Sequence, residues 1–293
     1  MIIGFIGLGV MGEPMATNLV NAAAQEVVVF DQRPEPVARL VAGGATAAAS
    51  VAEVGERAEV IMLSLPGGDQ LAEVVAGPQG LLSVDVDGKL IVDHTTAPVA
   101  LARELAQQVW EQGAEYCDAP IARTRQAARD GTLSIMVGGS HAAFNRLEPL
   151  LKPVASDVTH CGEVGAGQAT KLLNNMMLFQ NVRALAEAHA IASKLGEGLD
   201  LELDLDIVFG VIADASGGSF ALRNHGMKAM FVDTYPDEAF STVYALKDLG
   251  YALELAAEVG VDAAGAEGTK ALMEATRDAG FDQEYFPVMR RLL

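Results

Sequence analysis

Cysteine and long hydrophobic runs are scarce in this sequence of 293 residues. The two cysteines, Cys117 and Cys161, form no CxxC pair, which excludes a disulfide scaffold and a structural zinc site and fits a reducing compartment. No apolar run reaches the roughly 18 residues of a membrane span. The apolar N-terminus lacks the basic region and the cleavage site of a signal peptide. We therefore predict a cytoplasmic protein without a membrane partner.

Basic residues are also few, because the chain has 20 Lys and Arg against 39 Asp and Glu and a net charge of -19. A field of that sign repels phosphates, so we expect no nucleic-acid partner. An anionic small molecule can bind only where cations gather, and the candidates are Arg123, Arg125, Lys171 and Lys247. No His or carboxylate cluster indicates a metal. The length and the 51% of hydrophobic residues predict about two domains with cores of their own.

The first part of the chain alternates strand-like and helix-like segments. Short apolar runs, as expected of strands buried on both faces, lie at 2–6, 26–30, 59–63 and 90–93, with further strands expected at 114–118, 133–138 and 156–160. Helical patterns between them include 12–24, 34–43 and 98–111. This alternation predicts a parallel sheet with right-handed crossovers.

The pattern changes after about residue 165. A long helix is expected over 167–195, followed by helices over 201–214, 236–259 and 263–279. The acidic run at 199–206 alternates like a strand, but its position before an apolar stretch favours a solvated helix start. We predict an α/β chain with a parallel-sheet domain over 1–164 and an all-helical domain over 165–293, joined by the long helix.

A glycine-rich turn follows the first expected strand, with the order Gly7-Leu8-Gly9-Val10-Met11-Gly12. This G-x-G-x-x-G spacing between a strand and a helix is typical of a Rossmann-type dinucleotide site. The first glycine allows a tight turn, the second lets a pyrophosphate approach the backbone, and the third allows close packing of the helix on the strand. The helix N-terminus then attracts the phosphates. The alternative is a glycine-rich turn without a ligand.

Asp31 ends the second apolar run, 19 residues after Gly12. A carboxylate at this distance accepts hydrogen bonds from the adenosine ribose, and it repels a 2′-phosphate. The position therefore favours NAD over NADP. Arg33 leaves NADP open, because its guanidinium can pair with the extra phosphate.

Four blocks in order along the chain resemble the β-hydroxyacid dehydrogenases, which include 3-hydroxyisobutyrate dehydrogenase and tartronate semialdehyde reductase. They are GFIGLGVMGEPMATNL at 4–19, DAPIARTRQAARDGTLSIMVGG at 118–139, GAGQATKLLNNM at 165–176 and LKDLG at 246–250. The resemblance implies a Rossmann domain followed by a helical domain, NAD(P) chemistry and hydride transfer between a hydroxy acid and its semialdehyde. A long helix that one small domain can scarcely cover also favours a homodimer or homotetramer.

The second block departs from most relatives, which have Ser-Gly-Gly where this chain has Ala122-Arg123-Thr124. In the family this stretch holds the substrate carboxylate. The change is more similar to a subgroup of sulfolactaldehyde and succinic semialdehyde reductases, which have Gly-Arg-Thr there. Because an Arg offers a bidentate, charged donor, the departure favours a strongly anionic or differently sized acid as substrate and puts plain 3-hydroxyisobutyrate in doubt.

Lys171 is the expected catalytic residue. An ammonium beside a carbonyl oxygen can donate the proton that the alcohol needs, and the neutral amine can take it back in the reverse reaction. Asn175 lies four residues further on the same helix face, with Asn174 on an adjacent edge. The resemblance gives these residues the same roles, Lys171 catalytic and Asn175 substrate-binding. Without it, a lone helical lysine is more often a solvated surface charge.

Other candidates for the cofactor are Leu65 and Pro66, in a strand-to-helix loop, together with Thr96 and Lys247. Thr95 and Thr96 could instead cap the helix that begins near Pro98. By pattern alone, Lys247 and Asp248 are an exposed polar pair on an amphipathic helix. The resemblance instead places Lys247 in the family's distal block, which closes over the cofactor. Two rival functions stay open: imine reduction, and a non-enzymatic dinucleotide-binding protein. Relatives of both kinds commonly lack the lysine of the catalytic block.

Overall fold

The computed structural model describes residues 1–22, 24–236 and 239–293. The chain divides into two compact units, Met1–Lys171 and Leu172–Leu293, which are described separately. The division falls inside helix α8, Ala166–Leu199. The domain boundary expected between residues 164 and 165 stays a prediction.

Unit 1 is built on one sheet in the order β3-β2-β1-β4-β5-β6-β8-β7, with β9 paired to β8. The strands are β1 Ile2–Ile6, β2 Glu26–Phe30, β3 Thr46–Ala47, β4 Val60–Leu63, β5 Leu90–Asp93, β6 Glu115–Asp118, β7 Ile121–Ala122, β8 Leu133–Gly138 and β9 Ala155–Gly162. The strands from β3 to β6 are parallel, as predicted. Strand β8 departs from this arrangement, because it runs antiparallel to β6 and β7. The connection from β6 to β8 contains only a five-residue helix, whereas a parallel crossover usually carries a long one.

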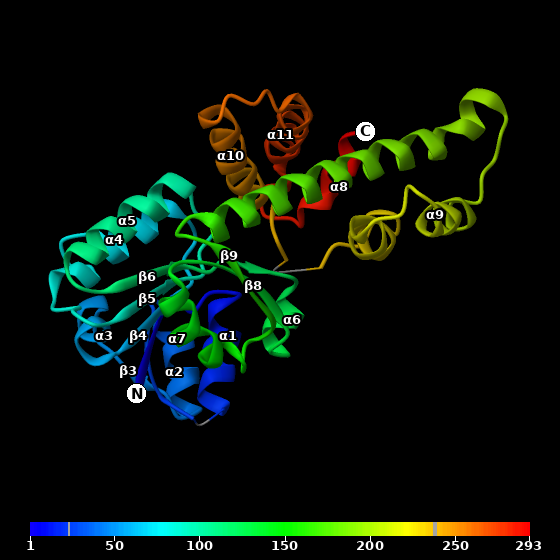
Figure 1. Ribbon diagram of the computed structural model, residues 1–293. Helices are drawn as coiled ribbons and strands as arrows, with labels where there is room; N and C mark the ends of the chain where they lie inside the picture. The colour runs from blue at the N-terminus through cyan, green and yellow to red at the C-terminus, as the bar shows by residue number, and fades with distance from the viewer. Residues whose placement is uncertain (23, 237–238) are drawn as a thin grey trace. The chain divides into compact units, whose positions relative to one another are not determined.

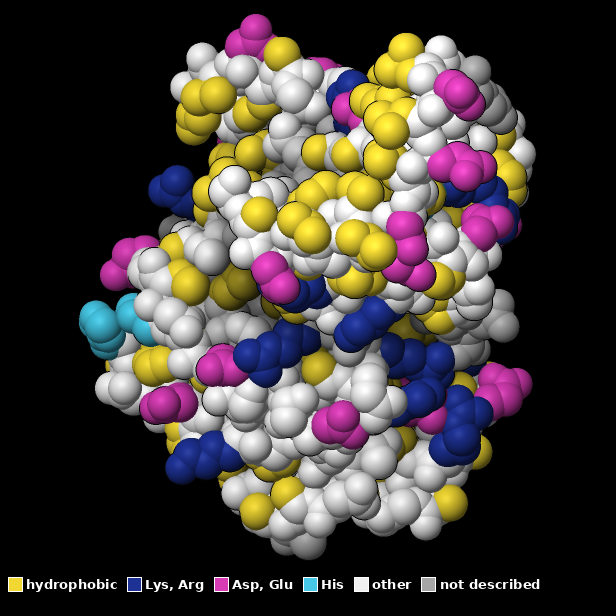
Figure 2. Space-filling view, turned by 90° about the vertical axis from the view of Figure 1, so that its right-hand side faces the viewer, with side chains coloured by type: hydrophobic (Ala, Val, Ile, Leu, Met, Phe, Trp, Pro, Cys, Tyr) yellow, Lys and Arg dark blue, Asp and Glu magenta, His cyan; other side chains and the backbone are white. Residues whose placement is uncertain are grey.

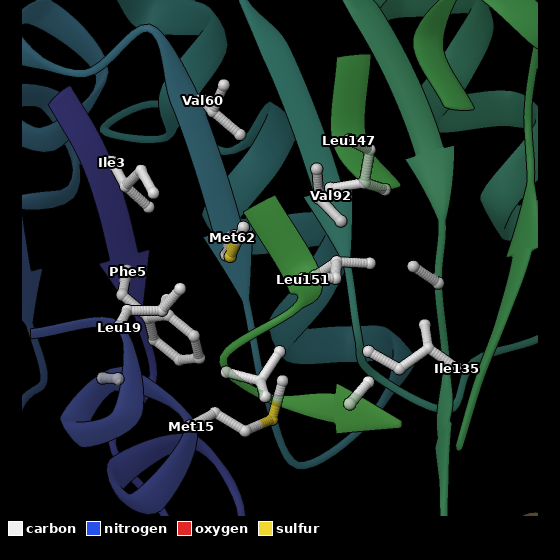
Figure 3. Packing of buried hydrophobic residues seen from close by; sticks show 14 of the residues in the cluster. Ile3, Phe5, Met15, Leu19, Val60, Met62, Val92, Ile135, Leu147 and Leu151 are labelled. Atoms are coloured by element: carbon white, nitrogen blue, oxygen red, sulfur yellow. The ribbon is translucent and has the colours of Figure 1, made fainter. Parts of the chain in front are cut away.

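Helices cover both faces of this sheet (Figure 1). They are α1 Gly12–Asn21, α2 Pro34–Ala42, α3 Val51–Arg57, α4 Gly68–Ala76, the short η1 Leu81–Ser83, α5 Val99–Glu111, α6 Arg125–Arg129 and α7 His141–Leu151. Side chains alternate along a strand, so successive residues face opposite sides of the sheet and pack in different cores. Val60 and Met62 pack with α1 and α7 (Figure 3), whereas Ile61 and Leu63 pack with α3, α4 and α5. Cutting Met62 to alanine would cost about 2–5 kcal/mol of folding free energy.

Unit 2 is helical. Besides most of α8 it contains α9 Leu205–Asp214, the π-helix η2 Leu222–Met230, α10 Thr242–Glu258, α11 Ala264–Thr276, the π-helical turn η3 Arg277–Phe281 and the 3-10 helix η4 Phe286–Leu292. The predicted helical domain and long helix are therefore confirmed. Its core joins Phe179 and Val182 of α8 to residues of α9, α10, α11 and η4. No helix in the described ranges is long and apolar enough to cross a bilayer.

Two expected helix boundaries in unit 2 are wrong. The acidic run does not start a helix at residue 201, because the Asp204 side chain accepts hydrogen bonds from the backbone N–H groups of Asp206 and Ile207 and so begins α9 at Leu205. Helix α10 begins at Thr242 rather than at 236. Residues 237–238 of that expected helix, like residue 23 of the one over 12–24, lie outside the described residues.

Candidate active site

The glycine-rich turn lies between β1 and α1, beside the end of β4. Gly7 has a φ of +92°, and a Cβ built on it would lie 2.3 Å from the Ser64 carbonyl oxygen. A Cβ on Gly12 would lie 2.0 Å from the Gly7 oxygen, so neither position accepts a side chain. A Cβ on Gly9, in contrast, would meet nothing within 4 Å. The turn therefore has no space for a side chain at Gly7 and Gly12 but is open at Gly9, where a pyrophosphate can approach the backbone.

Asp31 follows β2 and is attached to this turn. Its Oδ2 accepts a hydrogen bond of 2.7 Å from the Leu8 N–H, and its Oδ1 accepts one of 2.8 Å from the Arg33 N–H. The Arg33 guanidinium bonds both Asp31 and the Leu8 carbonyl oxygen. Burial alone would raise the pKa of Asp31, but the bonds from Arg33 and Leu8 outweigh it and lower that pKa. A carboxylate and a guanidinium therefore stand together where the adenosine ribose is expected.

A hydrogen bond of 3.0 Å from the Leu65 N–H to the Thr95 Oγ1 joins the loops after β4 and β5. Pro66 is exposed and Thr96 is half-buried. Pro98, and neither threonine, is the N-cap of helix α5. Thr95 instead holds the loop that carries Leu65.

The Ala122-Arg123-Thr124 stretch lies at the end of β7. Arg123 has a φ of +86°, a left-handed conformation that costs a non-glycine residue about 1–2 kcal/mol. Its guanidinium donates to the Thr132 carbonyl and to Ser156, and it forms an ion pair with Asp157. Thr124 caps α6 by accepting a hydrogen bond from the Ala127 N–H. The side chain expected to bind an anion is therefore paired with a carboxylate of the chain itself.

Lys171 and Asn175 occupy successive turns of α8. Lys171 is half-buried, and Asn175 is buried. The Asn175 Nδ2 donates to the Asp248 Oδ2 at 2.7 Å, and its Oδ1 accepts from the Asn174 Nδ2 at 3.1 Å. Because a carboxylate can only accept, Asp248 fixes which way the Asn175 amide points.

Lys247 and Asp248 are adjacent on α10. The Lys247 Nζ lies 2.9 Å from the Asp248 Oδ1 and 5.1 Å from the centre of the Tyr251 ring. The Asp248 side chain is only 3% exposed, so the alternative of an exposed polar pair is wrong for this residue. Asn174, Asn175, Asp248 and Lys247 form one chain of contacts within unit 2. Sequence reasoning missed the role of Asp248, because nothing local showed that it faces α8.

Both halves of the sequence match family models. Residues 2–162 match the NAD-binding domain of 6-phosphogluconate dehydrogenase, and residues 165–292 match the model described as NAD-binding of NADP-dependent 3-hydroxyisobutyrate dehydrogenase. The chain belongs to the β-hydroxyacid dehydrogenase family. Its predicted fold, its nicotinamide dinucleotide cofactor and its oxidoreductase class are thereby confirmed.

Named relatives agree with this family membership. The 2-(hydroxymethyl)glutarate dehydrogenase of Eubacterium barkeri is 36% identical over 256 residues, which are 87% of this chain and 82% of that protein. Human mitochondrial 3-hydroxyisobutyrate dehydrogenase is 34% identical over 87% of this chain and 75% of its own length. The structure of Mycobacterium tuberculosis 3-hydroxyisobutyrate dehydrogenase with L-serine superposes with a TM-score of 0.89 at 32% identity, covering 99% of this chain and 98% of that one.

Proposed function

We propose that this β-hydroxyacid dehydrogenase interconverts a small anionic hydroxy acid and its semialdehyde with NAD, using Lys171 as general acid and base. The observation that carries the proposal is the pairing of Lys171 with Asn175 one helical turn away, the latter held by the buried Asp248. A donor ammonium next to a fixed carboxamide suits a substrate with one reacting oxygen and one oxygen to be oriented.

The bound nicotinamide supplies or accepts the hydride. In the direction of reduction, the Lys171 ammonium polarises the aldehyde oxygen and gives it a proton as the alcohol forms; in oxidation, the neutral amine takes the hydroxyl proton. Asn174 and Asn175 orient the substrate. Positioned proton transfer of this kind contributes roughly 10²–10⁴-fold to the rate.

The cofactor would be held by the turn over residues 7–12, by Asp31 and by the loop residues Leu65, Pro66 and Thr96, with Lys247 contributing from the helical unit. Asp31 supports a preference for NAD, because its lowered pKa keeps it ionised at neutral pH and unfavourable to a 2′-phosphate. Asp31→Ala should therefore raise kcat/KM with NADPH about tenfold relative to NADH, as Arg33 is released toward the phosphate. Unchanged NADH/NADPH selectivity would show that another residue sets it.

For the substrate we propose an acid with a strong second anion near Ala122, Arg123 and Thr124. Two observations support this class. The Arg123 guanidinium is already oriented by the Asp157 carboxylate of β9, so it can exchange that partner for an anionic ligand. One of the relatives is also named for a dicarboxylic hydroxy acid.

The test is NADH oxidation with methylmalonate, succinic and tartronate semialdehydes and sulfolactaldehyde, against neutral aldehydes of matched length. A preference of at least about tenfold for one anion is expected, the value of one charge-assisted hydrogen bond. Equal rates with neutral and anionic aldehydes would contradict the proposed substrate class.

We further propose a homodimer or homotetramer in the cytoplasm. Large apolar side chains of α8 and α9, including Met177, Ile207 and Val211, are more than 60% exposed, and such a surface favours a second copy. Both cysteines are free, as expected in a reducing compartment. Ile207→Asp with Val211→Asp should lower the mass measured by sedimentation to that of the monomer. An unchanged mass would place the interface elsewhere.

A further inference from the structure

Three polar side chains are completely buried where the carboxyl ends of strands β5 and β6 meet the start of helix α8. Asp93 ends β5, Asp118 ends β6, and the two lie opposite each other in the strand register. Gln168, in the first turn of α8, is buried as fully as the two acids. Because an unsatisfied buried polar group costs about 1–3 kcal/mol, the partners of these three side chains indicate what the cluster does.

Asp118 holds the beginning of α8. Its Oδ1 accepts from the Gly165 N–H and its Oδ2 from the Gln168 N–H, both at 2.7 Å. The first N–H groups of a helix have no partner within the helix, so this carboxylate satisfies them and attaches α8 to the end of β6. A Cβ on Gly167 would lie 2.8 Å from the Asp118 carboxylate, which leaves no room for a larger residue there.

Gln168 connects the same helical turn to the loop after β5. Its Oε1 accepts from the Ala97 N–H at 3.1 Å, and its Nε2 donates to the Thr95 carbonyl at 2.6 Å and to the Asp93 Oδ2 at 3.4 Å. The Thr95 hydroxyl in turn holds the Leu65 N–H. The Gln168 side chain therefore joins α8 to the loop after β5 and, through Thr95, to the loop that carries Leu65.

Lys171 lies three residues after Gln168, on the next turn of the helix. We propose that Gln168 is a positioning residue that sets the place of Lys171 relative to the loops at 65 and 95–97. This inference rests on the proposed function, in which Lys171 transfers the proton. A displacement of about 1 Å in a reacting group can cost 10²-fold in rate, so the bonds of Gln168 act on turnover through the helix.

Gln168→Glu tests this role, because it keeps the size of the side chain and the acceptor for Ala97 but has a donor for Thr95 only when protonated. The titratable groups around the new carboxyl are Asp93, which the side chain contacts, Asp118, which accepts from the backbone N–H of the same residue, and Tyr116, which bonds Asp93. The ratio of variant to wild-type kcat should fall at least about tenfold near pH 8 and recover as the pH is lowered to about 5.5, with NADH affinity changed less than about twofold.

Two further variants separate positioning from a merely structural role. Gln168→Asn keeps the amide but is too short to reach Thr95, so its loss of kcat should not depend on pH. Gln180→Glu is the matched control on α8, where the native side chain donates only to the Met176 carbonyl, and its kcat ratio should stay near one. A pH-independent loss in Gln168→Glu, or an equal loss in Gln180→Glu, would overturn the proposal.

Amide hydrogen exchange tests the attachment without using activity. Exchange of the segment 165–171 should become faster in Gln168→Asn, since the helix start loses its tie to the loop. Unchanged exchange together with normal kcat would overturn the positioning role. Loss of the proposed function has a different signature, because wild-type kcat in Lys171→Ala would refute the proton transfer while leaving the exchange result unaffected.

Discussion

The two units bury their apolar surface to different extents. In unit 1 the exposed large hydrophobic side chains among the described residues are Met1, Val10, Val41 and Trp110, and all the others are in unit 2. Figure 2 shows such side chains gathered over the helices of unit 2. A sheet covered by helices on both faces closes its own cores, whereas a long helix with few helices around it does not. This difference supports the proposal that the helical unit provides the surface on which a second copy associates.

The polar interiors of the units differ in the same way. In unit 1, Asp118 and Gln168 bond mainly to backbone groups, at the start of α8 and in the loop after β5. In unit 2, Asn175 and Asp248 bond to other side chains. The buried polar groups of unit 1 are thus tied to the backbone, whereas those of unit 2 depend on the side chains around them.

The largest expected effect is on Lys171, the last residue of unit 1. Lys171→Ala should lower kcat at least about 100-fold, because it removes the proton donor. Binding of NADH, measured by fluorescence, should stay unchanged because the glycine turn is intact. Lys194→Ala on the same helix is the control, since that ammonium bonds only the Leu293 carbonyl in the structure. Near-normal turnover in Lys171→Ala would refute its role.

In unit 2 the sharpest test is Asp248→Asn, which is nearly isosteric. It removes the charge that pairs with Lys247 and the acceptor-only partner of Asn175. The loss of a charge-assisted bond of about 2 kcal/mol corresponds to a kcat/KM lowered about 30-fold. Asp262→Asn, an exposed position after α10, should have no effect. If both variants behave alike, the buried carboxylate has no role in the site.

Arg123 tests whether an ion pair between side chains of unit 1 can open to bind a substrate. Arg123→Ala should raise KM for an anionic substrate about tenfold and leave a neutral aldehyde unaffected. Asp157→Asn should have the opposite effect on KM, because it releases the guanidinium from its ion pair. If Asp157→Asn raises KM as much as Arg123→Ala does, the pair is structural and Arg123 does not bind the substrate anion.

The last prediction concerns stability rather than activity. Burial raises the pKa of Asp93 to about 7 and that of Asp118 to about 6. The folded state binds these protons more tightly than the unfolded chain does. The contribution of each carboxyl to the free energy of unfolding is therefore fully present below about pH 4 and is lost as the pH rises through its pKa in the folded state. The free energy of unfolding of Asp93→Asn, relative to wild type, should increase from pH 4 to 7 with a slope below about 1.4 kcal/mol per pH unit. Urea unfolding at several pH values measures it, and a flat difference would contradict the raised pKa.

Much of the fold follows from local patterns. The runs at 2–6, 26–30 and 90–93 form strands with those bounds, because each is a short apolar segment that both cores accept. The direction of β8 could not be predicted, since it depends on which distant strand it pairs with. The start of α9 was missed because the cap residue, Asp204, lies within a run of similar acids.

The candidate site was predictable where the spacing of residues within one short segment determines its conformation, as it does for the glycines of the 7–12 turn. It was not predictable where a residue acts through contacts distant in sequence. Asp248 is 73 residues from Asn175, and Gln168 is 75 residues from Asp93. One signal was available: an acid ending an otherwise apolar strand, as Asp93 does, predicts a buried carboxylate at the carboxyl end of that strand.

The most direct test of the account is chemical rescue of Lys171→Ala by small primary amines. An alkylammonium ion that enters the space left by the side chain can donate the missing proton. The rate of semialdehyde reduction should rise with amine concentration, and it should not rise with quaternary ammonium ions, which carry the charge but no proton. Recovery with quaternary ions as well, or no recovery while NADH and substrate still bind, would contradict Lys171 as the proton donor.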